Sequence, residues 1–354
     1  MFFTKQRVTT RKEKAMKTLY AGIDLHSTNN VVVVTDNEDK VLYRKRLRNE
    51  LDEVVGELSA FKKKLSGVVV ESTYNWYWLV DGLMDEGYRV HLANPGAIQQ
   101  YSGLKYSDDK SDARWLATLL RLGILPEGYI YPKEERPVRD LLRKRGYLVS
   151  QRTSNILSIQ NLLARNTGRR LSGDGVKRLT DLDVDKMLGN VDLALAVQAS
   201  AAVMRCLDAQ IKRIETVVLE RARLREEFKN LLTISGIGKT LGLTIMLEVG
   251  DIGRFPHVGD FASYARCVRS ERVSNGKKKG AGNAKNGNKY LGWAFMEAAG
   301  FARRYDDTIQ RYYQKKLAKK HVMVARKTVA HKLARACYYM LRDQTVFDVD
   351  RAFH

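Results

Sequence analysis

The sequence lacks the features that define several large classes of protein. Its three cysteines, Cys206, Cys267 and Cys337, lie far apart and form no C-x-x-C pair, which argues against a disulfide framework and against a structural zinc site. Five prolines exclude a collagen-like chain. No apolar run approaches the ~20 residues of a membrane helix, and the N-terminus lacks the apolar run of a secretion signal. We therefore expect a cytoplasmic protein without a membrane partner.

Positive charge, by contrast, is abundant and unevenly distributed. The 354 residues contain 62 Lys and Arg against 40 Asp and Glu, a net charge of +22. Residues 21–132 are mildly acidic at −3, whereas residues 133–178 carry +8 and residues 251–354 carry +13. A local basic excess is typical of proteins that neutralise nucleic-acid phosphates, although a solvated basic face is the alternative. The sequence therefore favours a polyanionic partner.

The first part of the chain alternates β-rich and helical patterns. Strands are predicted at residues 19–24, 30–35, 41–47, 67–71 and 89–93, and helices at 51–65, 76–84 and 111–122. This order predicts a mixed α/β domain over residues 1–132. Trp76, Tyr77 and Trp78 could stack on nucleobases, but on a helix after a strand such aromatics are more often part of the core.

From residue 137 the pattern becomes helical, with apolar residues at heptad spacing. These residues are Leu142, Val149, Ile156 and Leu163 in one helix and Met204, Leu207, Ile211, Ile214 and Val218 in another. Two such helices predict an antiparallel coiled coil over residues 133–228, within one chain or between protomers. Burial of each helix against the body of the protein is the alternative. Residues 229–354 are predicted to form an all-α C-terminal domain.

Two segments of this last region have the composition of phosphate-binding sites. Residues 235–240 resemble a helix-hairpin-helix turn, in which Gly236, Gly238 and Lys239 would hold a DNA phosphate; a simple corner between helices is the alternative. Residues 274–289 are rich in glycine and lysine, so we expect a mobile loop that becomes ordered on phosphates. The lysines expected to contact nucleic acid there are Lys277, Lys278, Lys279, Lys285 and Lys289.

Four carboxylates of the first domain form a candidate metal site. Asp24 and Glu71 each end a predicted buried strand, and Asp109 and Asp112 are three residues apart on one helical face. Clustered carboxylates repel one another unless cations neutralise them, and their oxygens suit Mg²⁺ or Mn²⁺. Two such ions could clamp the attacking and leaving oxygens of a phosphodiester. The alternative is a set of solvated acids, with Asp109 as a helix cap. The six histidines have no metal-ligand spacing, and we assign them no role.

Several separated motifs resemble those of a known family. GIDLH contains Asp24, VVVES contains Glu71, and SDDKSDARWLA contains Asp109 and Asp112. LLTISGIGKTLGLTIMLEVGDIGRF and FASYARCVRSERVSNGKKKGAGNAKNGNKYL follow in the last third of the chain. In this order the motifs resemble the insertion-sequence transposases with an N-terminal RuvC-like DEDD domain, which are related to the Piv invertase and include the bridge-RNA-guided recombinases.

The resemblance implies a fold and a chemistry. It implies an RNase H-like (RuvC-like) N-terminal domain, a coiled coil and a helical transposase domain. The four acids would bind Mg²⁺, and the nucleophilic serine falls on Ser274, with Ser270 as the fallback. The expected reaction is cleavage and rejoining of double-stranded target and donor DNA through a covalent phosphoserine, guided by a structured non-coding RNA. A homo-oligomer, dimeric or tetrameric, associated with the nucleoid of a bacterial or archaeal cell, is implied as well.

Two other functions remain open at this point. One is a metal-dependent nuclease or Holliday-junction resolvase that uses water in place of the serine. The other is a nucleic-acid-binding protein without catalytic activity. A covalent protein–DNA adduct would distinguish the recombinase from both.

Overall fold

The computed structural model describes residues 18–98, 109–280 and 286–353, and within these ranges the side chains of Asp109, Lys110 and Arg272 are excluded. It divides into two compact units, one ending at Ile130 and the other beginning at Tyr131. We call them the N-terminal unit and the C-terminal unit. The predicted contact residue Lys285 lies outside the described residues. No helix in the described ranges is long and apolar enough to cross a membrane.

The N-terminal unit contains a five-stranded mixed sheet, which confirms the predicted α/β class. The strands are β1 (Leu19–Leu25), β2 (Asn29–Asp36), β3 (Val41–Arg48), β4 (Leu65–Glu71) and β5 (Val90–Ala93). Their order in the sheet is β3-β2-β1-β4-β5. β1, β2 and β3 pair antiparallel, whereas β4 pairs parallel with both β1 and β5. The central strand β1 therefore has a parallel neighbour on one side and an antiparallel neighbour on the other.

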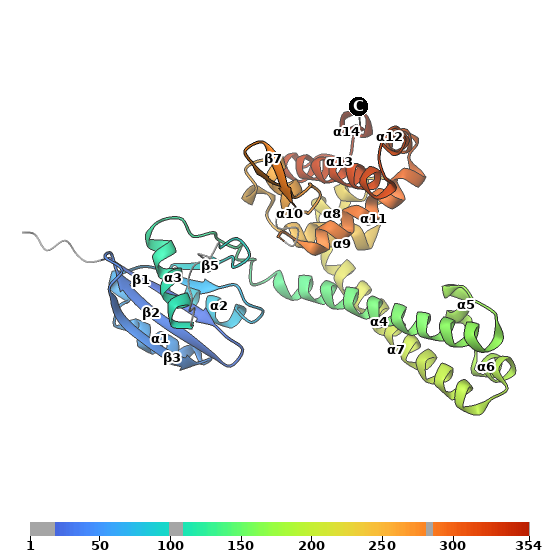
Figure 1. Ribbon diagram of the computed structural model, residues 1–354, viewed down its shortest axis with the longest axis horizontal. Helices are drawn as coiled ribbons and strands as arrows, with labels where there is room; N and C mark the ends of the chain where they lie inside the picture. The colour runs from blue at the N-terminus through green and yellow to red at the C-terminus, as the bar shows by residue number, and fades with distance from the viewer. Residues whose placement is uncertain (1–17, 99–108, 281–285, 354) are drawn as a thin grey trace, which may run out of the picture. The chain divides into compact units, whose positions relative to one another are not determined.

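Helices cover both faces of this sheet (Figure 1). On one face, α1 (Leu51–Ser59) and α2 (Tyr77–Asp85) bury Val54 and Leu79 against Ile23 and Val70. On the other face, α3 (Asp109–Arg121) packs on the sheet through buried alanine and leucine side chains. Trp76 is buried in the first of these layers, so it is a core residue.

The first helix is shorter than the sequence predicts. The apolar spacing predicted a helix over residues 51–65, but α1 ends at Ser59 and residues 62–64 form one 3₁₀ turn. Leu65 already belongs to β4. The last apolar residue of the predicted helix, Leu65, therefore belongs to the sheet, because a strand that begins here buries Val68, Val69 and Val70.

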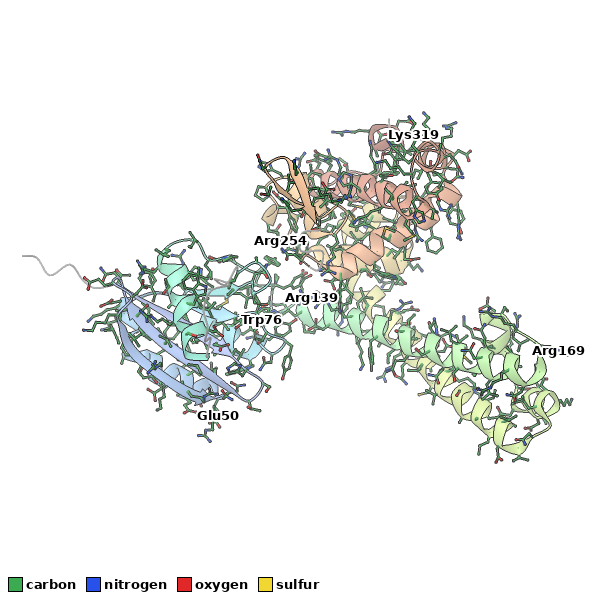
Figure 2. All side chains as sticks on the ribbon, in the orientation of Figure 1. Glu50, Trp76, Arg139, Arg169, Arg254 and Lys319 are labelled. Carbon is green, nitrogen blue, oxygen red and sulfur yellow. The ribbon has the colours of Figure 1, made fainter. Side chains whose placement is uncertain are left out.

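In the C-terminal unit two long helices form a hairpin. They are α4 (Arg136–Thr167) and α7 (Val191–Ala222), and the short helices α5 (Gly173–Arg178) and α6 (Asp181–Leu188) join them. Arg145 contacts Glu215 at 2.5 Å and Arg152 contacts Asp208 at 2.5 Å. From the first ion pair to the second, the residue number rises in α4 and falls in α7, so the two helices are antiparallel. They extend to a tip beside Arg169 (Figure 2).

The predicted seam of the hairpin is mostly buried. Ile156 and Leu163 of α4 share a core with Met204 of α7, while Val149 is only half-buried. The pairing lies within one chain. At the other end Leu142 joins the main core of the unit, so the hairpin and the C-terminal helices share apolar contacts across the predicted boundary at residue 228. Supercoiling of the pair stays a prediction.

The remaining helices pack around one apolar core. They are α8 (Glu226–Leu231), α9 (Lys239–Val249), α10 (Val258–Tyr264), α11 (Lys289–Tyr305), α12 (Asp307–Leu317), α13 (Val322–Asp343) and α14 (Val349–Phe353), with a 3₁₀ turn at Ile252–Arg254. Ile245 of α9, Phe295 of α11 and Leu333 of α13 are completely buried in this core.

The C-terminal region is not all-α as predicted, because it also contains a β-hairpin. β6 (Arg272–Ser274) pairs antiparallel with β7 (Lys277–Gly280). Asn275 and Gly276 connect them with φ values of 50° and 68°. An Asn-Gly pair with both φ values positive is the preferred two-residue turn between antiparallel strands. The prediction of a mobile loop is therefore wrong for residues 274–280. There the Asn-Gly turn pairs two strands, although lysine and glycine are abundant in the segment.

Candidate active site

Asp24 and Glu71 lie at the ends of two neighbouring parallel strands. Ile23 of β1 pairs with Val70 of β4, so the residue that follows each of them reaches the same edge of the sheet. Asp24 is only 4% exposed, and Glu71 is half-buried. A hydrogen bond joins the two carboxyl groups. The structure thus brings together two of the four predicted acids.

Both acids point toward the face of the sheet that α3 covers. Two residues before Asp24, Gly22 lies so close to α3 that a Cβ atom there would be 2.0 Å from the carbonyl oxygen of Ala113. Two residues before Glu71, Val69 packs in the cluster to which α3 contributes. Side chains two residues apart on a strand point to the same face. Glycine at position 22 therefore allows α3 to lie directly over the acids.

The first turn of α3 provides the third acid. Asp112 lies in this turn, and its negative charge acts on Glu71. Asp109 is the first residue of the same helix, but its side chain lies outside the described part of the structure. At its other end α3 is fixed by Arg121, which donates two hydrogen bonds to the carboxylate of Asp39 at 2.5 and 2.8 Å. The helix is thus held at both ends, with Asp112 near the sheet edge.

The acids of this site affect the protonation of Glu71. The pKa of Glu71 is raised to about 7, first by burial and then by the hydrogen bond with Asp24 and the charges of Asp24 and Asp112. Only His26 acts in the opposite direction among the named causes. Close carboxylates cannot all be ionised without a penalty. Glu71 therefore holds a proton near neutral pH when no cation is bound.

His26 is a site residue that the sequence did not predict. Its Nε2 lies 3.3 Å from Oδ2 of Asp24. Its backbone carbonyl accepts hydrogen bonds from Asn49 and Asn75, each at 3.0 Å. These amides fix the turn after β1: Asn49 directly follows β3, and Asn75 lies in the turn between β4 and α2. Partners 23 and 49 residues away in the chain leave no sequence signal.

Carboxylate oxygens at this edge fit a hard divalent cation. The donors are the oxygens that Mg²⁺ and Mn²⁺ prefer, and burial together with the nearby carboxylates raises the pKa of Glu71. Among the described side chains, however, no group of three or more His, Cys, Asp or Glu is already assembled as a metal-binding cluster. Any such cluster would need Asp109, or an approach of Asp112, in addition to Asp24 and Glu71.

Ser274 lies in the C-terminal unit, at the end of β6. It is exposed and faces Lys277 across the hairpin, while Ser270 is half-buried. The exposed side chains of Lys277, Lys278 and Lys279 follow the turn directly. Glu271 does not approach the serine as a base; it forms ion pairs with Arg269 at 2.8 Å and Lys278 at 3.4 Å. The hairpin therefore presents an exposed serine next to a row of lysines.

The turn before α9 has the tight geometry that the sequence suggested. Gly236 has a φ of +94°, and a Cβ atom there would be 2.3 Å from the backbone nitrogen of Ala302. Gly238 precedes the first residue of α9, Lys239, and no side chain caps the helix. A groove of about 680 Å³ runs along this turn and along Phe301 of α11. The free backbone N–H groups at this helix start are available to an anion.

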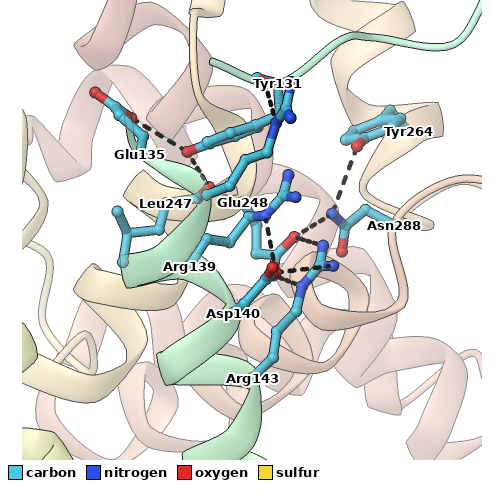
Figure 3. A network of polar contacts seen from close by, with 10 residues as sticks. Tyr131, Glu135, Arg139, Asp140, Arg143, Leu247, Glu248, Tyr264 and Asn288 are labelled. Atoms are coloured by element: carbon cyan, nitrogen blue, oxygen red, sulfur yellow. Dashed lines mark hydrogen bonds and ion pairs between the residues drawn. The ribbon is translucent and has the colours of Figure 1, made fainter. Parts of the chain in front are cut away.

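A buried polar network connects the helical hairpin to the segment that follows the serine (Figure 3). Glu248 of α9 is only 3% exposed. Arg143 of α4 donates to both of its oxygens, at 2.6 and 2.7 Å. Asn288 donates to Glu248 at 2.7 Å and also caps α11 by accepting from Tyr290 and Leu291. One carboxylate thus holds α4, α9 and the start of α11 together.

Comparison with known proteins identifies the family. A transposase family model for the DEDD domain of the IS110 type matches residues 21–166, and the model described as "Transposase IS116/IS110/IS902 family" matches residues 228–314. The chain is 24% identical over 292 residues to the transposase for insertion sequence element IS1111A of Coxiella burnetii, covering 79% of this chain and 77% of that protein. It is also 24% identical over 257 residues to the transposase for insertion sequence element IS1533 of Leptospira borgpetersenii, covering 68% and 73%.

Both models describe transposases of the same type, and they match separate parts of the chain. The first match contains Asp24, Glu71, Asp109 and Asp112, and the second contains Ser274. The chain belongs to the IS110/IS116 family of insertion-sequence transposases.

Proposed function

We propose that this transposase cuts and rejoins DNA at the acidic edge of its N-terminal sheet, an RNase H-like domain. The observation that carries this proposal is the Asp24–Glu71 pair on adjacent parallel strands, with the pKa of Glu71 raised to about 7 beside Asp112. The strand order β3-β2-β1-β4-β5 with a helix over the acids supports it. Negative charge concentrated at a sheet edge is suited to hold a cation against a phosphodiester.

Asp24, Glu71, Asp109 and Asp112 would hold the cation. When bound, Mg²⁺ or Mn²⁺ supplies a Lewis acid for the phosphate that is cut. Glu71, whose pKa is raised to about 7 by burial and by the neighbouring acids, would have to be ionised to hold such a cation. His26 and the two asparagine amides keep Asp24 in place, because they fix the turn that follows it.

Ser274 is the proposed nucleophile. Its Oγ attacks phosphorus, an Oγ–P bond forms, and the bond from phosphorus to one deoxyribose oxygen breaks. The serine proton passes to a carboxylate, and the leaving oxygen takes up a proton. A hydroxyl of the second DNA strand then attacks the phosphoserine and releases Ser274, which rejoins the DNA. Lys277, which pairs with Ser274 across the hairpin, would offset the developing negative charge, and Lys278 and Lys279 follow it on β7.

The acids and the serine lie in different compact units of the chain. A reaction centre that needs both can combine the N-terminal unit of one protomer with the C-terminal unit of another. We propose a homo-oligomer, dimeric or tetrameric, for this reason. A structured non-coding RNA that selects target and donor by base pairing is part of the proposal, supported by the family resemblance and by the +22 net charge.

One observation favours a second candidate, a metal-dependent nuclease or junction resolvase. In the described part of the C-terminal unit, no side chain hydrogen-bonds to the Ser274 hydroxyl as an activating base would. A water molecule activated at the acidic edge would then be the nucleophile.

Trapping the reaction on a denaturing gel separates the two candidates. The labelled substrate is a plasmid that carries the DNA flanking this reading frame, with RNA transcribed from the adjacent non-coding segment. The recombinase predicts a covalent protein–DNA adduct that Ser274→Ala and Asp24→Asn abolish and that Ser270→Ala retains. Cleavage without an adduct, retained in Ser274→Ala and lost in Asp24→Asn, would establish the nuclease.

A further inference from the structure

A cavity of about 320 Å³ lies between α13 and the segment that leads into α14. Both helices belong to the C-terminal unit, and Figure 1 shows α12 and α14 beside one end of α13. Lys332 and Arg335 line the cavity from α13, together with the aromatic rings of Tyr339 and Phe347. Both cations are half-buried. This surface lies beyond residue 314, where the second family match ends.

Among the described residues the two cations meet no carboxylate, although the Nζ of Lys332 lies 5.7 Å from the ring centre of Tyr312. Elsewhere on α13, Arg326 pairs with Glu297 at 3.4 Å and Arg342 pairs with Asp343 at 2.7 Å. No carboxylate within the described ranges forms an ion pair with Lys332 or Arg335. The acid in the cavity lining, Asp348, instead accepts a hydrogen bond from the backbone of Arg351 at 3.0 Å. Half-burying a cation without a carboxylate partner opposes folding, so an anion that binds here would be stabilised.

The positive charge extends along one face of α13. Lys327, His331 and Arg335 are four residues apart, a rise of ~6 Å per step along the helix. The pKa of His331 lies below its ordinary value because of its burial and the positive charges of Arg335 and Lys332. Arg335 and Lys332 are therefore close enough to His331 for their positive charges to act on it. A row of cations at this spacing suits successive charges of an extended polyanion.

We propose that this face of α13 and its cavity form a docking site for the phosphate backbone of double-stranded DNA. The cavity accepts one phosphate against Lys332 and Arg335, and the row through Lys327 continues along the strand. The site is separate from the predicted lysines of the β-hairpin and from the turn before α9. The proposal rests on the proposed function only in that the protein binds DNA as a transposase. It does not depend on Ser274 or on a bound metal.

Salt-dependent binding tests the site without requiring catalysis. The full chain with Asp24→Asn, in EDTA, is titrated with a fluorescent 30-bp duplex at several salt concentrations. Replacing Lys332 and Arg335 with glutamine should reduce the slope of log K against log salt by ~0.9, because the two side chains hold one phosphate and each neutralised phosphate contributes ~0.9. The charge-conserving exchange Lys332→Arg with Arg335→Lys should keep the slope of the parent protein.

Three outcomes would overturn the proposal. An unchanged slope in the glutamine variant would show that DNA phosphates are not held there. A reduction with a structured RNA of similar length but not with the duplex would assign the site to RNA. Equal losses in the glutamine variant and in the charge-conserving variant would show a structural role. Because the glutamine variant removes two half-buried charges that form no ion pair with a described carboxylate, its thermal midpoint should not fall by more than a few degrees, which verifies that it folds. The binding measurement needs no catalysis, so it remains valid even if the protein does not recombine DNA as proposed.

Discussion

The substitution Glu71→Gln should stabilise the N-terminal unit above pH 7 when no divalent cation is present. The folded unit holds the Glu71 proton more tightly than the unfolded chain does, since the pKa rises from 4.5 to about 7. With a raised carboxyl pKa, the free energy of unfolding is highest below pH 4.5, falls as the pH rises to 7 and stays low above it. Glutamine carries no charge and therefore removes this loss.

The size of the effect follows from the pKa. The difference between 4.5 and about 7 corresponds to roughly 3.4 kcal/mol at 1.36 kcal/mol per pH unit. Glu71 is half-buried, so solvent screens part of the interaction, and we expect a gain of about 1–2 kcal/mol at pH 8. At pH 4 the wild-type protein and the variant should agree to within about 0.5 kcal/mol, since both then carry a neutral side chain.

Urea unfolding in EDTA, followed by tryptophan fluorescence, measures this difference. In a Trp293→Phe background the remaining tryptophans, Trp76, Trp78 and Trp115, all lie in the N-terminal unit. Glu57→Gln is the control of opposite sign, because a hydrogen bond from Lys45 lowers the pKa of Glu57. It should lower the stability at pH 8. A Glu71→Gln variant that is less stable than wild type at pH 8, or that gains as much at pH 4, would refute the reasoning.

Three further substitutions test the supporting structure. Gly22→Ala, whose Cβ would lie 2.0 Å from a backbone oxygen of α3, should reduce DNA cleavage at least ~10-fold, whereas Gly56→Ala, with nothing within 4 Å, should retain it. Glu248→Gln should lower the free energy of unfolding, measured by urea unfolding, by about 3 kcal/mol. The control Glu226→Gln, which breaks an exposed ion pair, should lower it by less than ~0.5 kcal/mol. Gly276→Ala, at a φ of 68°, should cost the β-hairpin about 1–2 kcal/mol and reduce DNA joining while leaving Mn²⁺ binding unchanged.

Much of the N-terminal unit could be predicted because its signals are local. The valine-rich runs that form β2 and β4 are buried on both faces, so hydrophobicity alone located them. An acid directly after such a run must emerge at the sheet edge, which is why Asp24 and Glu71 were recognised. Their pairing followed once β1 and β4 were parallel neighbours. Residues of this kind are predictable because one strand determines their position.

Other parts depend on contacts between distant segments. His26 became a site residue only because Asn49 and Asn75 fold back onto its carbonyl, and no pattern around His26 indicates this. The basic segment after residue 270 was predicted as a loop, but the turn at Asn275 and Gly276 pairs two short strands. There, one dipeptide determined the local structure, while the composition of the whole segment suggested the opposite.

Calorimetric titration of Mn²⁺ into the full chain tests the central claim most directly, namely that the acidic edge of the N-terminal sheet holds a divalent cation. The account predicts saturable binding to the wild-type protein that weakens at least ~10-fold in Asp24→Asn. Ser274→Ala is the matched control and should bind Mn²⁺ as the wild type does. Binding to Asp24→Asn with wild-type affinity would contradict the account.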